Sequence, residues 1–314
     1  MPTTDLIGPV LVTGANGFLG SYIVEELLAA GVSVVATDLD MAGARPLPVA
    51  VQTLDIRDTE RFVQTIEQGG VKRVVNAAGI VPDSNAVKNP MRTLEVNCMA
   101  LWALLLALRT KLPDVRVVTI STRAIYGAYL PSEGPLGEAS APRPEGIYGA
   151  SKAAADVVAV AMAEQLQANF VAARVTGLFG PYQRHANPLF DMASAAVEGR
   201  TIDWPAGGGA TYEFNSAAQT AKAVLPLLGE RALKHRIYNV GSGQVQTLKA
   251  VADLIRAEIP GAKIDLGPGY FPNVAPRAAM DVARYREEFP SEGRFDFRAG
   301  LQDLLAWLRT SRAR

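Results

Sequence analysis

The chain has 314 residues, enough to bury one large core or two unequal ones. Its 31 Lys and Arg balance 31 Asp and Glu, so no net charge would recruit nucleic acid or an anionic membrane surface. A single cysteine, Cys98, excludes an internal disulfide, and with only two histidines the usual Cys/His zinc clusters cannot form. We therefore expect a metal-free protein of the reducing cytoplasm that acts on a small molecule.

The amino-terminal residues show no secretory signal, because they lack a basic segment and the short apolar run that follows ends in glycine. No later run approaches the roughly 20 apolar residues of a membrane-spanning helix. We accordingly expect neither a membrane nor a nucleic acid as partner.

Short β-branched runs alternate with longer Ala- and Leu-rich stretches through the first half of the chain. We predict strands at Val10–Thr13, Val32–Thr37, Val71–Asn76 and Val115–Ser121. Such alternation is typical of a parallel sheet covered on both faces, which binds ligands at the carboxyl ends of its strands. The predicted fold is α/β, a doubly wound Rossmann sheet with a smaller carboxyl-terminal substrate domain.

Proline, glycine and aromatic residues become frequent after Arg174, as expected of substrate-binding loops. The strand-like run Arg236–Val240 is predicted to return to the main sheet, which makes the second domain discontinuous. We predict a dinucleotide-binding domain of residues 1–175 and about 213–242, and a substrate domain of about 176–212 and 243–314.

The first predicted strand runs into Gly14-Ala15-Asn16-Gly17-Phe18-Leu19-Gly20, and an apolar helix follows. Gly14 permits a tight turn, Gly17 lets the backbone approach a pyrophosphate, and Gly20 lets the helix pack close to the strand. A glycine triad alone also fits a purely structural turn. Asp38, which follows the second predicted strand, strengthens the prediction because its carboxylate can accept both hydroxyls of an adenosine ribose and would repel a 2′-phosphate. This favours NAD over NADP.

Tyr148 and Lys152 open another apolar helix, and their spacing puts the phenol and the ammonium on one face. A phenol is a poor base unless positive charge stabilises its phenolate, and Lys152 can supply that charge. Thr122, beyond the fourth predicted strand, can donate a hydrogen bond to the same substrate oxygen. Asn97 can anchor a water relay behind the lysine.

In these residues the chain resembles an extended short-chain dehydrogenase/reductase of the nucleotide-sugar epimerase/dehydratase type. The resemblance covers nearly the whole chain through GANGFLG, Leu54-Asp55-Ile56-Arg57-Asp58, Asn76-Ala77-Ala78-Gly79, Glu95-Val96-Asn97, Ser121-Thr122-Arg123-Ala124-Ile125-Tyr126-Gly127, YGASK and Tyr238-Asn239-Val240-Gly241-Ser242-Gly243. It implies a catalytic Thr122, an acid/base Tyr148 and a ribose-binding Lys152. The predicted cofactor contacts are Gly14, Asn16, Gly17, Phe18, Leu19, Gly20, Asp38, Asp55, Ile56, Ala77, Ala78, Tyr148, Lys152 and Val175.

The chain departs from this family at three places. Arg123 and Ala124 stand where dehydratases carry an Asp-Glu pair, so dehydration is not expected. Gly177 replaces a substrate-binding asparagine, and Tyr212 replaces an arginine that holds the substrate diphosphate. Two losses aimed at one ligand favour a substrate without a nucleotide. Candidate substrate contacts are Val81, Arg123, Gly177, Arg184, His185 and Arg277.

The function predicted first is hydride transfer between NAD and a secondary alcohol or lactol of a small polar compound, such as a sugar, a sugar acid or a hydroxy acid. The alternative is a nucleotide-sugar epimerase or keto-reductase of the same family. A third possibility is a dinucleotide-sensing regulator without catalysis, against which the intact Thr122, Tyr148 and Lys152 argue.

Two apolar segments predict that the chain associates with a second copy of itself. Leu94–Leu108 is apolar on nearly every face, and Ala153–Leu166 is rich in small apolar residues, so both need cover on several sides. In the family that the chain resembles, the matching helices pair across a homodimer interface. We therefore predict a homodimer.

Overall fold

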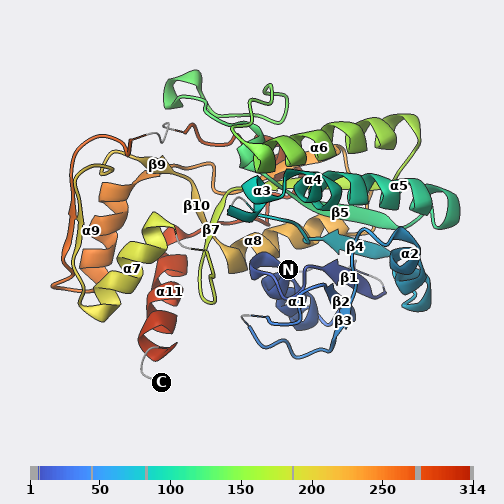
Figure 1. The fold of residues 1–314 in the computed structure, drawn as a ribbon, viewed down its shortest axis with the longest axis horizontal. Helices are drawn as coiled ribbons and strands as arrows, with labels where there is room; N and C mark the ends of the chain where they lie inside the picture. Colours follow the sequence, from blue (N-terminus) through green and yellow to red (C-terminus); the bar gives the residue numbers. More distant parts are fainter. Residues whose placement is uncertain are drawn as a thin grey trace.

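The computed structural model describes residues 6, 8–43, 45–81, 84–185, 187–272 and 277–311. A seven-stranded parallel sheet crosses its larger part in the order β11-β6-β5-β4-β1-β2-β3 (Figure 1). Its strands are β1 (Val10–Thr13), β2 (Val34–Asp38), β3 (Val51–Thr53), β4 (Arg73–Asn76), β5 (Arg116–Thr122), β6 (Phe170–Val175) and β11 (Ile237–Val240).

All four strands predicted in the first half are confirmed: β1 has the predicted bounds, and the other three differ by one or two residues at one or both ends. The return of the chain to the main sheet near residue 237 is confirmed as well, since β11 pairs with β6. β6 itself was not predicted, because a short run containing two alanines fits a buried helix as well as a strand.

Helices cover both faces of the sheet, as a doubly wound fold requires. α1 (Phe18–Ala29) and α8 (Ala217–Val224) pack on one face, and α2 (Thr59–Gln68), α5 (Ala100–Lys111) and α6 (Ile147–Gln165) pack on the other. Alternate residues of β1 enter the two cores: Val10 and Val12 join the first, and Leu11 joins the second.

A separate hydrophobic cluster lies beside the sheet, at the left of Figure 1, built on α7 (Pro188–Glu198), α9 (Leu248–Glu258) and α11 (Phe297–Ser311). Three short strand pairs edge it: β7 (Gly177–Phe179) with β10 (Phe214–Ser216), β8 (Ile202–Trp204) with β13 (Ile264–Leu266), and β9 (Thr211–Tyr212) with β12 (Gln246–Thr247). Between α9 and α11 the chain forms α10 (Ala283–Glu288), whose Tyr285 packs in the hydrophobic core on the α1 and α8 face of the main sheet. The remaining elements are α3 (Ser84–Lys88), η2 (Arg123–Ile125), η3 (Pro131–Glu133) and η4 (Leu225–Leu228).

A continuous helical stretch runs from Pro90 to Lys111 through α4 (Pro90–Leu94), a π-helical turn η1 (Glu95–Met99) and α5. By length and composition alone it could span a membrane, so the expectation that no run approaches this length was wrong for these residues. The buried core helix of a globular protein passes the same test. Leu101, Leu104 and Leu108 of this stretch lie in the core against the sheet, which accounts for its apolar character.

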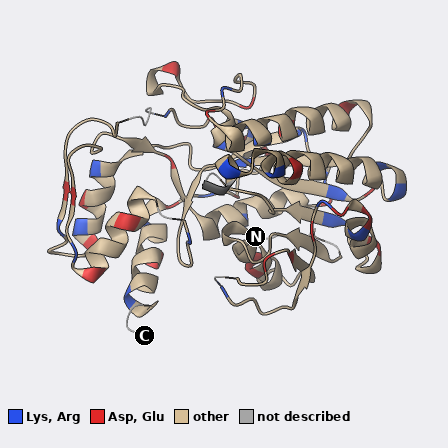
Figure 2. Ribbon diagram, in the orientation of Figure 1, with Lys and Arg blue, Asp and Glu red and all other residues tan. Residues whose placement is uncertain are grey.

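The outer faces of this stretch and of α6 carry exposed apolar side chains, including Met99, Leu106 and Val157, and both helices are mostly uncharged along their length (Figure 2). We expect a homodimer at micromolar concentration by light scattering. The double variant Leu106→Arg/Val157→Arg should be monomeric, because dimerisation would bury both arginines unpaired, each close to the same arginine of the partner subunit. Leu130→Arg, which alters an exposed apolar residue outside the two helices, should leave the mass unchanged. A monomeric unmodified protein would contradict this prediction.

Candidate active site

β1 ends in the glycine turn that the sequence predicts to bind a pyrophosphate. Gly14 has a φ of +64°, a conformation that favours glycine, and a Cβ there would lie 2.7 Å from the backbone nitrogen of Ala78. A Cβ on Gly20 would collide with the carbonyl oxygen of Gly14. Both positions therefore require glycine, and the turn leads directly into α1.

A cavity of about 320 Å³ opens beside this turn at the carboxyl ends of β1, β2 and β4. Its lining is Gly14, Gly17, Asp38, Leu39, Asp40, Leu54, Asp55, Ile56, Ala77, Ala78, Gly79, Ile80, Arg92 and Val96. The structure thus brings predicted cofactor contacts from four separate segments around one space. A dinucleotide fits the chemistry of this lining, because a glycine cradle adjoins a carboxylate and small apolar walls.

Two of the three acidic residues that line the cavity, Asp38 and Asp55, are held in place by neighbours. Asp38 ends β2, where its Oδ2 accepts from the backbone N–H of Asn16 over 2.8 Å and its Oδ1 accepts from that of Asp40 over 3.0 Å. Each oxygen keeps a lone pair for a further hydroxyl donor. Asp55 accepts from the Arg57 guanidinium, with an Nη2 to Oδ2 distance of 2.6 Å, and this bond lowers the pKa of the Asp55 carboxyl.

Three other predicted cofactor contacts pack away from the cavity. Leu19 and Val175 are buried in the core between α1 and the sheet, and the ring of Phe18 meets that of Tyr22 edge-on at 5.8 Å. Any contact that these residues make with a dinucleotide is expected to come from their backbone.

Tyr148 and Thr122 meet where α6 begins and β5 ends. Tyr148 is the second residue of α6 and is half-buried, and Thr122 is the last residue of β5. Burial raises the pKa of the Tyr148 phenol, and its hydrogen bond to Thr122 opposes that rise. Tyr148 and Thr122, both predicted as catalytic residues, are therefore in direct contact, and the Tyr148 phenol is protonated at neutral pH.

Lys152 lies one turn further along α6 and is buried, with 8% of its surface exposed. Its Nζ donates to the carbonyl oxygen of Ile120 over 3.0 Å. Burial lowers the pKa of Lys152 to about 8. The ammonium is thus poised close to neutral pH, where its charge depends on its neighbours.

Asn97 comes from the π-helical turn η1, a local widening of the helix that turns its side chain inward. Its Oδ1 accepts from the backbone N–H of Ile80 over 2.8 Å, and its Nδ2 donates to the Ile80 carbonyl oxygen and to the Ser151 hydroxyl. A Cβ on Gly79 would lie 3.0 Å from Asn97 Oδ1 and 3.4 Å from Lys152 Nζ. Asn97 and Lys152 therefore adjoin at the end of β4, as the sequence predicts.

A second cavity of about 310 Å³ opens in front of Tyr148. Its described lining is Ala86, Val87, Ala124, Glu145, Gly146, Ile147, Tyr148, Gly149 and Arg277. Among the sequence-predicted substrate contacts, Arg277 lies in this lining, and its Nη2 is 3.4 Å from Glu145 Oε2. Tyr148 was predicted as the catalytic residue, and the rest of the lining was not predicted, since a loop that borders a cavity only in three dimensions leaves no periodic pattern in the sequence.

The remaining candidate substrate contacts lie elsewhere. Arg123 is buried, with burial lowering its pKa to about 10, and it donates to the carbonyl oxygen of Ala278 over 3.0 Å. Arg184 is exposed and contacts the Ala42 carbonyl oxygen. The others are His185, whose carbonyl oxygen accepts from Gln183, and the exposed Val81 and Gly177.

A parallel sheet with a glycine turn after β1 and an acidic residue after β2 defines a dinucleotide-binding enzyme, and the Tyr148–Lys152 pair places it among the short-chain dehydrogenase/reductases. The model of the NAD dependent epimerase/dehydratase family matches residues 10–241, and the chain belongs to this family. The resemblance seen in the sequence and the Rossmann fold are thereby confirmed, as is NAD as the family's cofactor.

Curated relatives and solved structures match over nearly full length. The chain is 30% identical over 290 residues to a UDP-glucose 4-epimerase of Corynebacterium glutamicum, covering 87% of this chain and 85% of the relative. It is 29% identical over 328 residues to a dTDP-glucose 4,6-dehydratase of Streptomyces niveus, covering 97% and 94%. A UDP-glucose 4-epimerase of Thermus thermophilus solved with NAD superposes with a TM-score of 0.81 at 25% identity, over 96% and 99% of the two chains.

The position of Asp38 predicts a preference for NAD over NADP. We expect kcat/KM to favour NAD over NADP by at least about tenfold, because the fixed carboxylate would face the extra phosphate of NADP. Asp38→Ala should reduce that preference. Asp265→Ala, a change on β13, is the control and should preserve it. Equal use of both cofactors by the unmodified protein would refute the prediction.

Proposed function

We propose that this protein is a NAD-dependent enzyme of the nucleotide-sugar epimerase or keto-reductase type, which oxidises a carbinol carbon of the sugar to a ketone or reduces a ketone to the alcohol. The observation that carries the proposal is the shared cavity of Tyr148 and Arg277, which offers a proton-transferring phenol and a cation to one ligand. In this proposal residues 1–175 and about 213–242 hold NAD and also line much of the sugar site, and Arg277 reaches that site from the proposed substrate domain.

In the proposed reaction Tyr148 takes the hydroxyl proton of the substrate, and Thr122 hydrogen-bonds to the same oxygen. Lys152 stabilises the phenolate and holds the cofactor ribose, and Asn97 fixes the backbone next to the lysine. Gly14, Gly17, Asp38 and the residues after β4 hold NAD, which when bound supplies the hydride acceptor.

The position of Arg277 favours a substrate that contains a nucleotide diphosphate. Tyr212 stands where the family would carry an arginine, and its ring stacks on Phe214 with centroids 5.0 Å apart. The charge of Arg277 opposes the rise in the pKa of Tyr212 that burial causes, so a guanidinium lies near the position that lost one. Arginine pairs well with phosphate oxygens, and Arg277 can take over the diphosphate contact. Together with the relatives, this supports a nucleotide sugar over the small polar substrate that the sequence favoured.

The second candidate remains a dehydrogenase of a small sugar or sugar acid, which the loss of asparagine at Gly177 favours. Dehydration is not proposed, because Arg123 is buried against Ala278 where an acidic pair would be needed.

Calorimetric titration of the NAD-loaded protein with uridine, thymidine and guanosine diphosphate sugars tests the proposal. We expect micromolar affinity for at least one, weakened about tenfold or more by Arg277→Ala and unaffected by Arg309→Ala on α11. Turnover without net NADH would identify an epimerase. Failure of every nucleotide sugar to bind, with NADH released from a free sugar or sugar acid, would establish the second candidate instead.

A further inference from the structure

Three polar side chains lie one helical turn apart on a single face of α6: Tyr148, Lys152 and Asp156. Each reaches the same short segment at the end of β5. Their partners there, in the same order, are the hydroxyl of Thr122, the carbonyl oxygen of Ile120 and the hydroxyl of Ser121. The proposed reaction uses the first two side chains and leaves the third without a role.

Asp156 is a carboxylate in the protein interior, with 1% of its surface exposed. Its Oδ2 accepts from Ser121 over 3.0 Å and from Arg174 Nε over 2.9 Å, and its Oδ1 has no hydrogen-bond partner among the described residues. Burial raises the pKa of the Asp156 carboxyl, and the charge of Arg174 and the hydrogen bond from Ser121 oppose that rise and favour the ionised form. Burying a charge with an unpartnered oxygen is costly, and an apolar or amide side chain would fill the same space more cheaply. The charge itself is the property that needs an explanation.

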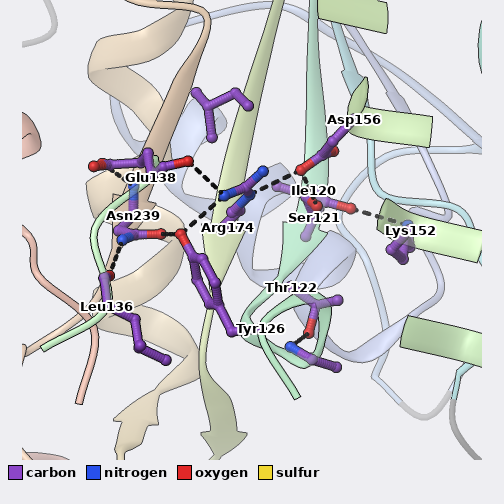
Figure 3. A network of polar contacts seen from close by, with 12 residues as sticks. Ile120, Ser121, Thr122, Tyr126, Leu136, Glu138, Lys152, Asp156, Arg174 and Asn239 are labelled. Atoms are coloured by element: carbon purple, nitrogen blue, oxygen red, sulfur yellow. Dashed lines mark hydrogen bonds and ion pairs between the residues drawn. The ribbon is translucent and has the colours of Figure 1, made fainter. Parts of the chain in front are cut away.

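Arg174 fixes this carboxylate from β6, where it lies beside Ser121 in the sheet register. Its Nη1 donates to the Tyr126 hydroxyl over 2.9 Å, and Tyr126 donates to Asn239 Oδ1 over 2.8 Å, so the chain of contacts ends on β11 (Figure 3). The Asp156 carboxylate is therefore held directly from β5 and β6, and Arg174 is in turn linked through Tyr126 to β11.

Lys152 lies one helical turn from Asp156 on the same face of α6, and its Nζ donates to Ile120, the residue next to Ser121 on β5 (Figure 3). Burial disfavours its charge, and the negative charge of Asp156 opposes that effect. The other titratable group facing it is Cys98 of η1, and burial raises the pKa of that thiol to about 11, so it is neutral. Arg174 and Tyr148 complete the titratable surroundings of Asp156. Among the described residues, Asp156 is thus the anion that supports the ammonium.

We propose that Asp156 is a positioning residue that keeps Lys152 protonated next to Tyr148. The inference rests on the proposed roles of Tyr148 and Lys152. Without the carboxylate, the buried ammonium would lose its proton at lower pH and no longer stabilise the phenolate.

The charge of Lys152 can be measured directly, without a substrate. In protein labelled with ¹³C at lysine Cε, the Lys152 resonance is assigned by its loss in Lys152→Arg, and its pH titration is followed by NMR. We expect Asp156→Asn, which keeps the shape and removes the charge, to lower the midpoint by about one pH unit or more. Asp156→Glu should restore the midpoint of the unmodified protein.

Two further variants keep the test decisive. If Asp156→Asn fails to fold because Arg174 is left unpaired, Asp156→Asn/Arg174→Gln removes both charges and should still lower the midpoint, by less than Asp156→Asn, because the loss of the Arg174 charge favours the ammonium. Glu230→Gln breaks the 2.7 Å ion pair with Arg73 near the opposite ends of the strands and should not move the Lys152 midpoint. A merely structural Asp156 would lower the melting temperature and leave the midpoint in place.

The pH profile of turnover gives a second readout. The limb of the kcat/KM profile at which Lys152 loses its proton should move to lower pH in Asp156→Asn and return in Asp156→Glu. An unchanged Lys152 midpoint in a folded charge-removing variant would overturn the inference. Full turnover by Tyr148→Phe would instead remove the proposed function, so the two failures are distinguishable.

Discussion

Tyr148→Phe should lower turnover by about 10²- to 10⁴-fold while leaving NAD affinity nearly unchanged. The phenol is the proposed acid/base, and general acid–base catalysis is typically worth that much in rate. The ring itself remains, so the cavity that it lines keeps its shape. Steady-state kinetics and calorimetry with NAD measure the two quantities separately.

The matched control for this variant is Tyr285→Phe. Tyr285 is also buried and donates its hydroxyl to the Ala223 carbonyl oxygen over 2.7 Å, far along the chain from α6. Its loss should cost stability of about 1 kcal/mol and leave turnover unchanged. Near-normal turnover by Tyr148→Phe would exclude Tyr148 from the reaction.

Gly20→Ala should weaken NAD binding roughly tenfold to a hundredfold. The added Cβ would collide with the Gly14 carbonyl oxygen, so the turn must move away from α1 and the cradle beside the cavity must change shape. Overpacking of this kind costs about 1 to 3 kcal/mol, which accounts for the expected loss. Calorimetry with NAD and thermal unfolding measure the effect.

Gly137→Ala is the control for the glycine turn, because a Cβ at Gly137 meets nothing within 4 Å and the backbone there is not left-handed. It should leave both NAD affinity and melting temperature close to those of the unmodified protein. If Gly20→Ala behaved like this control, the close packing of α1 on β1 would not be what shapes the NAD site.

The cofactor side of the site could be predicted because its motifs follow one another along the chain in a recognisable order. Gly14, Asp38, Tyr148 and Lys152 stand at fixed distances from predicted strands and helices, and the rule that ligands bind at the carboxyl ends of parallel strands brings them together. Asp156 carried the same kind of signal, since it continues the four-residue spacing of Tyr148 and Lys152. It was missed because a buried aspartate within an apolar helix gives no sign of its partners on other strands.

The substrate side could not be predicted in the same way. Arg123 directly follows Thr122 in the sequence and was for that reason predicted as a substrate contact, yet its guanidinium is buried and donates to the Ala278 carbonyl oxygen. Arg277 is more than a hundred residues away from Tyr148 in the sequence, yet it borders the cavity that Tyr148 lines. Neighbours along the chain point in different directions at the end of a strand, and loops from distant segments meet only after the domain has packed. The sequence by itself determined the fold, the family, the cofactor and the paired Tyr148 and Lys152, because each depends on local periodicity or short spacing. Only the tertiary structure decided which cation borders the cavity of Tyr148 and which strands contact the Asp156 carboxylate, because those contacts join residues that no local pattern connects.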